Sequence, residues 1–423
     1  MSATSSRGRL TVLQGAALYV GAVLGTGVIA LPALAAAAAG PASLLAWLAL
    51  VILSVPLAAT FAALGARYPD AGGVSTYVRQ AFGPRAAAVV GWCFYFAVPA
   101  GAPAAAMFGG AYVASALGGG QWTVLVTAAA LIVVVTATNL FGVTVSGRLQ
   151  LVLAALLVVL LLAAAAASAP HARLANLHPF APHGWLAIGQ AAALLVWSFA
   201  GWEAITHLAG EFRHPARDLP IATGIAVVVV GVLYMTTATS SVMVLGPAGE
   251  TSSAPLAELL ALGLGGKVQI LAAAAALLLT LGTMNAYFAG AAKLGAALGR
   301  DGALPAWFGA GSRAGDVPRR SLAVVAGLAM LALGGATLAD VGPRPLVLLT
   351  TGSFVTVYAL GAAAALRLLP RGSWAHRSAC IALVAVGGLF IATGWYLLWP
   401  LLMTACALAY LQVRSTVVAD SGA

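Results

Sequence analysis

Charged residues are scarce in this sequence. They make up 7% of its 423 positions, whereas a soluble domain carries roughly 25%. So few charges could not keep the water-facing surface of a protein of this size in solution. The shortage argues against a cytosolic enzyme, and the high apolar content argues against a disordered chain.

Cysteine is also scarce, and the common catalytic motifs are missing. The three cysteines, Cys93, Cys380 and Cys406, each lie in an apolar run, so neither a disulfide framework nor a metal-binding cluster is readable. The chain has no H-E-x-x-H, no phosphate-binding Gly-Lys motif and no G-x-S-x-G elbow. We therefore expect no enzymatic activity, no catalytic residues, no metal site and no cofactor.

Apolar residues are abundant instead. They form 62% of the chain, about 262 positions, and twelve membrane spans of about 20 residues need about 240. The sequence therefore predicts an all-α polytopic membrane protein with about twelve transmembrane helices in a single domain, 1–423. The predicted spans are 10–37, 41–65, 86–117, 122–142, 147–168, 185–209, 219–245, 266–298, 320–337, 345–366, 376–393 and 395–413. The first exceeds the roughly 7–15-residue core of a signal peptide, so we expect it to be retained.

The basic residues gather on one side of these spans. If the N-terminus is inside, 16 of the 20 Lys and Arg residues fall in cytoplasmic segments, and three, Arg173, Lys267 and Arg344, fall in outer loops. This positive-inside bias predicts a multi-pass protein of the plasma (inner) membrane with both termini cytoplasmic. It also explains the net charge of +10 through topology and anionic lipid, so the lipid bilayer is the expected partner and nucleic acid is not.

Two spans are interrupted near their middle. The first contains Leu24-Gly25-Thr26-Gly27-Val28, and the sixth contains Trp197-Ser198-Phe199-Ala200-Gly201-Trp202-Glu203. The two occupy corresponding positions if five helices repeat, and paired interruptions of this kind indicate a transporter binding site. We therefore predict discontinuous helices 1 and 6 in a 5+5 inverted repeat, with repeats at 10–168 and 185–366 and two further helices at 376–413.

The breaks themselves indicate what they bind. Unwinding frees backbone N–H and C=O groups, which persist in a membrane only where they line a cavity or a ligand. A half-helix that begins near Gly27 presents its positive end to an anion, and one that ends near Phe199 presents carbonyls to a cation. Opposite ends facing one cavity suit a zwitterion such as an α-amino acid. The alternative for Gly21 and Gly25 is close helix packing of the small-xxx-small kind.

Glu203 is the one acidic residue inside a predicted span. Its charge there costs about 2.5–3.5 kcal/mol on insertion scales, so it needs a partner, a proton or a function. Glu203 is a candidate proton carrier, a structural group that binds backbone N–H groups freed by the break, or both. His207 lies four residues further on the same helical face, and it is either a second coupling group or a packed or water-facing histidine.

Other small or polar residues within the spans are weaker candidates for the wall of a cavity. Pro99 and Gly101 belong to Val98-Pro99-Ala100-Gly101-Ala102-Pro103, which indicates a pliable helix or simply kinked packing. Threonine hydroxyls often bond to their own helix backbone, so polarity alone does not place them in a site. The polar candidates are Thr283, Asn285, Thr350, Thr351 and Ser353.

Five motifs follow one another in an order that is specific when they are taken together. They are Leu24-Gly25-Thr26-Gly27-Val28; Tyr68-Pro69-Asp70-Ala71-Gly72-Gly73 with Tyr77 and Ala81-Phe82-Gly83-Pro84; Trp197 to Glu203; Glu211-Phe212-Arg213-His214-Pro215-Ala216-Arg217-Asp218-Leu219-Pro220; and Gly299-Arg300-Asp301-Gly302-Ala303-Leu304-Pro305. Over nearly the whole chain they resemble the amino acid–polyamine–organocation (APC) superfamily of transporters. Within it, the sequence is most similar to the bacterial L-methionine and branched-chain amino acid exporters.

The resemblance implies roles for individual residues. Those implied to bind the substrate carboxylate are Gly25, Thr26, Gly27 and Val28, and those whose carbonyls are implied to bind its amine are Phe199, Ala200 and Gly201. The resemblance gives Trp197 and Glu203 gate positions, and Trp202 and His207 are further candidates for gating or coupling. Some relatives place a lysine in the fifth span in place of a sodium ion, but 149–167 contains none. Proton coupling, sodium coupling and exchange therefore stay open, and we favour the proton over sodium.

These features predict a secondary-active amino acid transporter that works by alternating access. No cation lies near the breaks to hold an acidic side chain, so neutral apolar amino acids (methionine, leucine, isoleucine and valine) are the expected substrates. Export follows from the resemblance alone. Import, exchange of another substrate class and a non-transporting amino-acid receptor stay as alternatives, and the sequence leaves the oligomeric state open.

Overall fold

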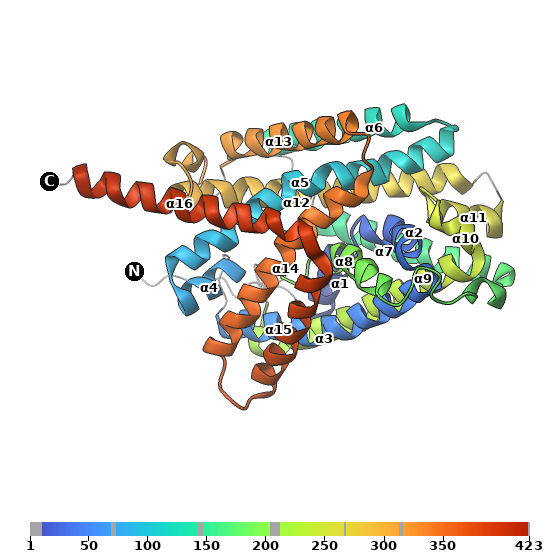
Figure 1. The fold of residues 1–423 in the computed structure, drawn as a ribbon, viewed down its shortest axis with the longest axis horizontal. Coiled ribbons are helices and arrows are strands. Elements are labelled where there is room, and N and C mark those ends of the chain that lie inside the picture. Colours follow the sequence, from blue (N-terminus) through green and yellow to red (C-terminus); the bar gives the residue numbers. More distant parts are fainter. Residues whose placement is uncertain are drawn as a thin grey trace.

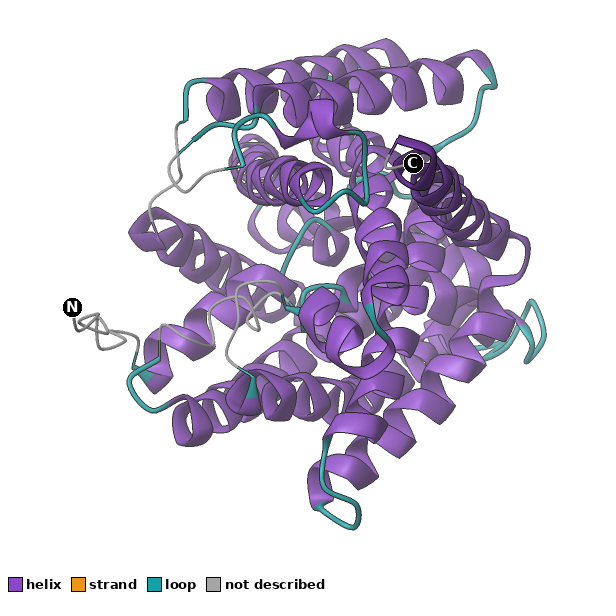
Figure 2. Ribbon diagram, turned by 90° about the vertical axis from the view of Figure 1, so that its left-hand side faces the viewer, coloured by secondary structure: helices purple, strands orange, loops and turns teal. Residues whose placement is uncertain are grey.

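The fold is a bundle of helices. A computed structural model describes residues 11–68, 73–142, 147–203, 212–265, 268–312 and 316–421, without the side chains of 147–151, 153–154 and 416–421. Every regular element within these residues is helical (Figure 2). Eight helical stretches among them are long and apolar enough to cross a membrane, which confirms the predicted all-α polytopic class.

The helices match the predicted spans closely. They are α1 Val12–Val23, α2 Gly27–Ala39, α3 Ser43–Arg67, α4 Val74–Phe82, α5 Pro84–Leu117, α6 Gln121–Leu140, α7 Gly147–Ser168, α8 Ala187–Phe199, α9 Pro215–Ser240, α10 Pro247–Glu250, α11 Pro255–Leu264, α12 Val268–Arg300, α13 Arg319–Leu338, α14 Pro343–Leu368, α15 Trp374–Thr393 and α16 Leu398–Ser421. Each predicted range holds a helix, and the first holds two. The short helices α4, α10 and α11 lie outside every predicted range.

Two hydrophobic clusters build the interior. The larger one joins α1, α2, α3, α8, α9, α14 and α15, and the smaller one joins α5, α6, α12 and α13. Helix α5 contributes side chains to both clusters, and in Figure 1 it runs along the layer that holds α12. The boundary between the clusters therefore lies against α5.

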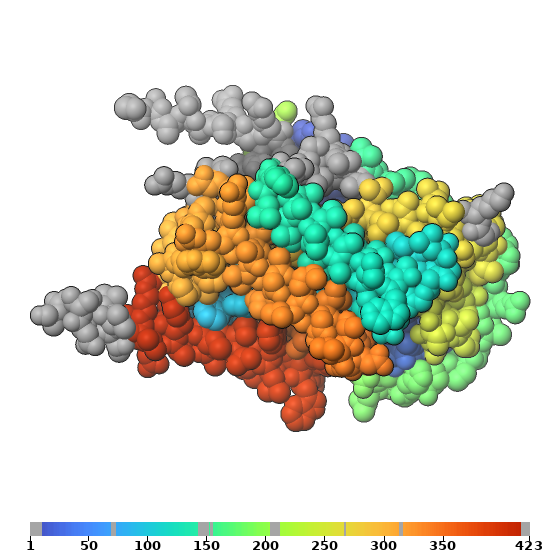
Figure 3. Space-filling model, turned by 90° about the horizontal axis from the view of Figure 1, so that it is seen from above, coloured from blue at the N-terminus to red at the C-terminus, as the bar shows by residue number. Residues whose placement is uncertain are grey.

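The outer faces of α6 and α13 are apolar. The two helices lie side by side across the face seen in Figure 3, and Val126, Val133 and Leu331 are among their exposed side chains. Water would disfavour such a surface, whereas lipid tails would not. This surface suits a protein that is surrounded by hydrocarbon.

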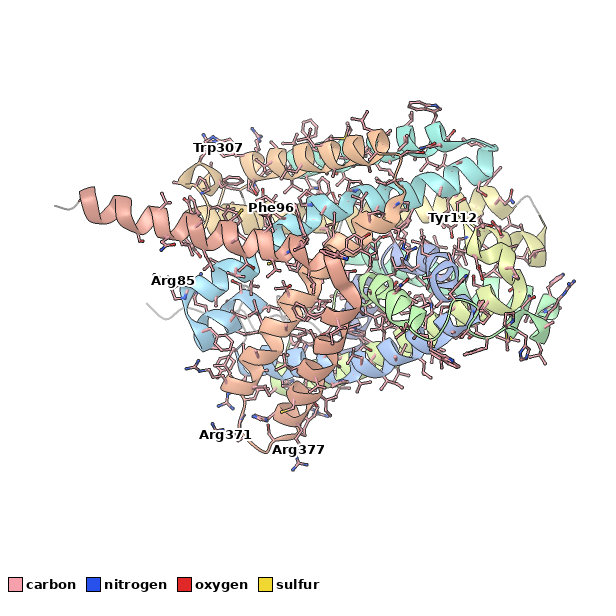
Figure 4. The ribbon with its side chains drawn as sticks, in the orientation of Figure 1. Arg85, Phe96, Tyr112, Trp307, Arg371 and Arg377 are labelled. Carbon is pink, nitrogen blue, oxygen red and sulfur yellow. The ribbon has the colours of Figure 1, made fainter. Side chains whose placement is uncertain are left out.

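The two ends of the bundle differ in charge. Arg85, Arg371 and Arg377 project from the left-hand and lower side in Figure 4, whereas Tyr112 lies near the opposite end. We call the first the arginine-rich end; there Asp301 pairs with Arg79 at 3.3 Å and with Arg300 at 3.0 Å. We call the opposite end, which carries α10 and α11, the far end.

Candidate functional site

The first predicted span is broken in the structure. Helix α1 ends at Val23 and α2 begins at Gly27, so Leu24, Gly25 and Thr26 are not helical. The backbone N–H of Gly25 bonds back to Val23 O at 2.7 Å. The first N–H groups of α2 have no intrahelical partner, as at any helix start, and they lie beside the break.

The sixth span is broken as well. Helix α8 ends at Phe199; Ala200 is extended (φ −70°, ψ 137°), and Gly201 has a φ of +124°. This conformation favours glycine because a side chain would be strained there. His207 and the predicted continuation of the span to 209 lie outside the described residues.

Buried tyrosine hydroxyls contact carbonyls that the breaks set free. Tyr234 Oη lies 2.8 Å from Val23 O and 2.6 Å from Ser198 O, and its single proton serves one of them at a time. Tyr19 Oη donates to Trp202 O at 3.0 Å. Unpaired backbone groups in a membrane are costly, so these hydroxyls stabilise both breaks from the side of α1 and α9.

A cavity lies between the two breaks and α5, α12 and α14. The empty space in it and at its open mouth, solvent included, is about 570 Å³. The residues that line it are Ala22, Val23, Gly25, Thr26, Ala97, Val98, Gly101, Ala102, Ala105, Trp197, Ala200, Thr283, Met284, Tyr287, Phe288, Thr350 and Phe354. None of these carries a charged side chain.

The first break meets the cavity at Gly25 and Thr26. Thr26 is buried, and its Oγ1 has no hydrogen-bond partner among the described residues. A Cβ on Gly25 would stand 3.5 Å from Thr283 Cγ2, an ordinary contact across the cavity. The first break therefore offers the cavity a close backbone approach and one hydroxyl that is free to bind.

Gly27 and Val28 do not line the cavity. A Cβ on Gly27 would collide with Ser198 Oγ and would stand 3.0 Å from Trp197 Cδ1. The glycine therefore permits close packing of α2 on α8. Val28 is buried in the larger hydrophobic cluster. Both residues were implied to bind the substrate, and the structure places them beside the cavity wall.

At the second break, Trp197 and Ala200 line the cavity. The Phe199 ring packs instead on Trp47 and Tyr234, with centroids 6.0 Å and 5.0 Å away. Phe199 O lies 3.5 Å from Tyr358 Oη. Of the three residues implied to bind an amine, Ala200 therefore has the most direct access to the cavity.

Glu203 and Trp202 lie behind the second break. Glu203 is buried, and its Oε2 accepts from Tyr358 Oη at 2.7 Å and from the Gly201 N–H at 3.1 Å. Trp202 is fully buried against the Tyr19 ring, 5.6 Å between centroids. Glu203 therefore satisfies a backbone N–H freed by the break, which is the structural role considered for it from the sequence.

The weaker candidates divide into two groups. Gly101 and Thr283 line the cavity, as does Thr350. Pro99 lies in α5 outside the lining, and Thr351 Oγ1 donates to Ala193 O at 3.1 Å, which joins α14 to α8.

Asn285 also belongs to the second group. Its Oδ1 accepts from Asn139 Nδ2 at 2.8 Å and from Thr138 Oγ1 at 3.1 Å. The contact joins α12 to α6, away from the cavity lining. Asn285 is therefore a helix-packing residue in this structure.

Several lining residues were absent from the sequence-based candidates. Those on α5 are Ala97, Val98, Ala102 and Ala105. They recur at the spacing of one helical face, and this run of small side chains is the signal that could have identified them from the sequence. On α12 and α14 they are Met284, Tyr287, Phe288 and Phe354. Residues four apart share a helical face, so extending Thr283 and Thr350 by one turn would have reached Tyr287 and Phe354.

Known proteins resemble the chain over most of its length. The family described as amino acid permease matches residues 10–399. An uncharacterized amino acid permease of Bacillus subtilis, YecA, is 34% identical over 407 residues, which cover 96% of each chain. The L-methionine/branched-chain amino acid exporter YjeH of Escherichia coli is 38% identical over 227 residues, covering 53% of this chain and 54% of its own.

A more distant relative is the branched-chain amino acid permease BcaP of Bacillus subtilis, at 24% identity over 237 residues, or 52% of this chain. The family match covers nearly the whole chain, and the relative YecA is aligned along almost its full length. The broken helices and the uncharged cavity between them agree with that match. The chain therefore belongs to the amino acid permease family of the APC superfamily.

Proposed function

We propose that the chain transports neutral, apolar amino acids across the plasma membrane by alternating access. The observation that carries the proposal is the cavity at the two breaks, which offers free polar groups on one side and uncharged walls elsewhere. An amino acid has the same division between a charged main chain and a side chain. The site supports binding of both parts at once.

The main chain of the substrate would bind at the breaks. The start of α2 carries the positive end of a helix dipole, and Thr26 Oγ1 is free to donate to a carboxylate. The ammonium group would bind carbonyls at the end of α1 and at Ala200, which line the same cavity. Both ends of the zwitterion would then be satisfied without a charged side chain.

The side chain of the substrate would lie against apolar walls. Val98, Ala102 and Phe288 line the cavity and belong to the smaller hydrophobic cluster. A charged side chain buried there without a partner would be costly. Size is a weaker filter, because one methylene changes binding in an apolar pocket by only about 1–3 kcal/mol. Leucine, isoleucine, valine and methionine should therefore compete with one another.

Export is the direction we propose, because YjeH is described as an exporter. We also propose that the arginine-rich end faces the cytoplasm, because the positive-inside rule places basic residues on that side. The proposed coupling ion is the proton, with Glu203 as its carrier in addition to its structural contacts. Import, exchange and sodium coupling are the alternatives, and the experiments below separate proton coupling from sodium coupling.

Proteoliposomes test the function directly. Purified protein should exchange labelled leucine across the bilayer, and unlabelled methionine, isoleucine and valine should compete. Lysine and aspartate should not compete. Exchange without this selectivity would contradict the substrate class, and binding without any flux would indicate a receptor.

The same liposomes test the coupling. Glu203→Gln keeps an acceptor oxygen but cannot release a proton, so exchange at equal pH should survive and accumulation driven by a pH gradient should vanish. A ratio of pH-driven flux to exchange flux equal to that of the wild type would remove Glu203 as the carrier. A sodium gradient applied at equal pH then shows whether sodium replaces the proton.

A further inference from the structure

Tyr112 joins three helices through one hydroxyl group. It lies near the far end of α5 (Figure 4) and is 1% exposed. Its Oη donates to Ile29 O of α2 at 2.7 Å and accepts from the Leu256 N–H of α11 at 3.2 Å. The hydroxyl donates its one proton to Ile29 O, and its oxygen accepts the hydrogen bond from the Leu256 N–H.

Helix α11 needs this bond because of its own sequence. Its N-cap is Ala254, which has no side-chain acceptor and makes no capping hydrogen bond. Pro255 follows and has no N–H, so Leu256 carries the first N–H inside the helix that needs a partner. Tyr112 takes the place that a serine or threonine cap would normally fill.

The other end of the link is α2, the half-helix that begins at the first break. Ile29 lies in the first turn of α2, two residues after Gly27, and α2 is buried along most of its length. Helices α10 and α11 pack on α2 at the far end. Any movement of α2 away from α11 must therefore break one of the two hydrogen bonds of Tyr112.

We infer that Tyr112 is a positioning residue that holds α2 against α11 and so opposes opening of the bundle at the far end. The inference rests on the proposed alternating access, in which the far end must open in part of the cycle. Its two bonds are buried, so losing them favours the open far end. The loss of one buried hydrogen bond should change the equilibrium between the closed and the open far end about fivefold.

Cysteine accessibility measures this opening. Ala105 lines the cavity, so Ala105→Cys in a background without Cys93, Cys380 and Cys406 reports access to it. A membrane-impermeant thiol reagent is applied to vesicles of known orientation, from the far end. Tyr112→Phe keeps the ring and removes both bonds, and the rate of modification should rise about fivefold or more.

Tyr95→Phe is the matched control. Tyr95 is also a buried tyrosine of α5, and its hydroxyl also makes two bonds, donating to Ser321 O at 3.0 Å and accepting from Ser321 Oγ at 3.3 Å. These bonds join α5 to α13 at the arginine-rich end. The control should not raise modification from the far end. An equal rise in both variants, or none in Tyr112→Phe, would overturn the inference.

A serine at position 254 separates coupling from simple capping. Ala254→Ser gives α11 its own cap for the Leu256 N–H, so Tyr112→Phe/Ala254→Ser should regain thermal stability but keep the raised accessibility. If accessibility returned to the wild-type rate, Tyr112 would only be a helix cap. If Tyr112→Phe does not fold, Ala254→Ser is measured alone. Its serine hydroxyl competes with Tyr112 for the Leu256 N–H, so accessibility should rise more weakly. No rise would refute the link.

The flux assay keeps this inference distinct from the proposed function. Accessibility reports the far end whichever amino acid is carried, so a rise in Tyr112→Phe would stand even if leucine proved not to be a substrate. Conversely, leucine exchange with unchanged accessibility would support transport and reject Tyr112 as its positioning residue.

Discussion

Tyr358 and Glu203 are joined by a buried hydrogen bond of 2.7 Å, which ties α14 to the broken sixth span. The same carboxylate oxygen accepts from the Gly201 N–H at 3.1 Å. The carboxylate therefore replaces a helical carbonyl at a point where the helix has stopped. This contact explains how an acidic residue is accommodated in the interior of the bundle.

Removing that carboxylate should destabilise the protein. Glu203→Leu leaves the Gly201 N–H without this acceptor, at an expected cost of about 1–3 kcal/mol, and leaves the Tyr358 hydroxyl with only the longer contact to Phe199 O. Glu203→Gln keeps an acceptor and should cost less. Thermal unfolding in detergent measures both, with Tyr358→Phe as the variant that removes one donor alone. Equal stability of the leucine and glutamine variants would contradict the structural role.

Gly25 and Gly27, two positions apart, should respond differently to valine. Gly25→Val projects into the cavity beside Thr283, so we expect a folded protein that no longer binds leucine. Gly27→Val collides with Ser198, so we expect poor folding whatever the substrate. Size-exclusion profiles and leucine binding distinguish them. Wild-type affinity in Gly25→Val would exclude backbone recognition at the first break.

Thr26 and Thr351 form a second matched pair. Thr26→Val removes a hydroxyl that makes no bond to the described protein, so stability should hold while leucine affinity falls about tenfold, the effect of one charge-assisted hydrogen bond. Thr351→Val breaks the bond to Ala193 O and should lower stability with little effect on affinity. Unfolding temperatures and leucine binding curves of both variants measure these effects. A loss of stability with unchanged affinity in Thr26→Val, or a loss of affinity with unchanged stability in Thr351→Val, would contradict the two assignments.

Asn285 should matter for packing and Thr283 for the site. Asn285→Leu deletes the acceptor of Thr138 and Asn139, and interhelical bonds in membranes average about 0.6 kcal/mol each. We expect an unfolding free energy lower by about 1 kcal/mol and unchanged leucine competition. Thr283→Val should leave stability unchanged and alter competition. A change of competition in Asn285→Leu alone would move the site towards α6.

The sequence predicted the elements well because hydrocarbon demands long apolar helices. The breaks were predictable too, since Gly25 and Gly201 interrupt spans that otherwise have no reason to stop. The short helices α10 and α11 were not, because helices of 4 and 10 residues have little periodic signal and depend on tertiary contacts such as the one with Tyr112.

The walls of the site were harder to predict than its position. Thr350 lines the cavity and Thr351 does not, because one residue turns a helix face by about 100°. Gly25 and Gly27 look equivalent in the sequence, and their different neighbours, Thr283 and Ser198, come from other spans. Assignments of this kind require the packing of distant segments, which a single sequence does not contain.

The tyrosines that donate to carbonyls at the two helix breaks also matter when the cavity is empty. A break that relied on its cargo to satisfy the backbone would be unstable when unloaded, and the carrier could reorient only while loaded. Here Tyr19 and Tyr234 donate to carbonyls at the breaks from within the protein. These carbonyls therefore keep a donor whether or not the cavity holds a ligand.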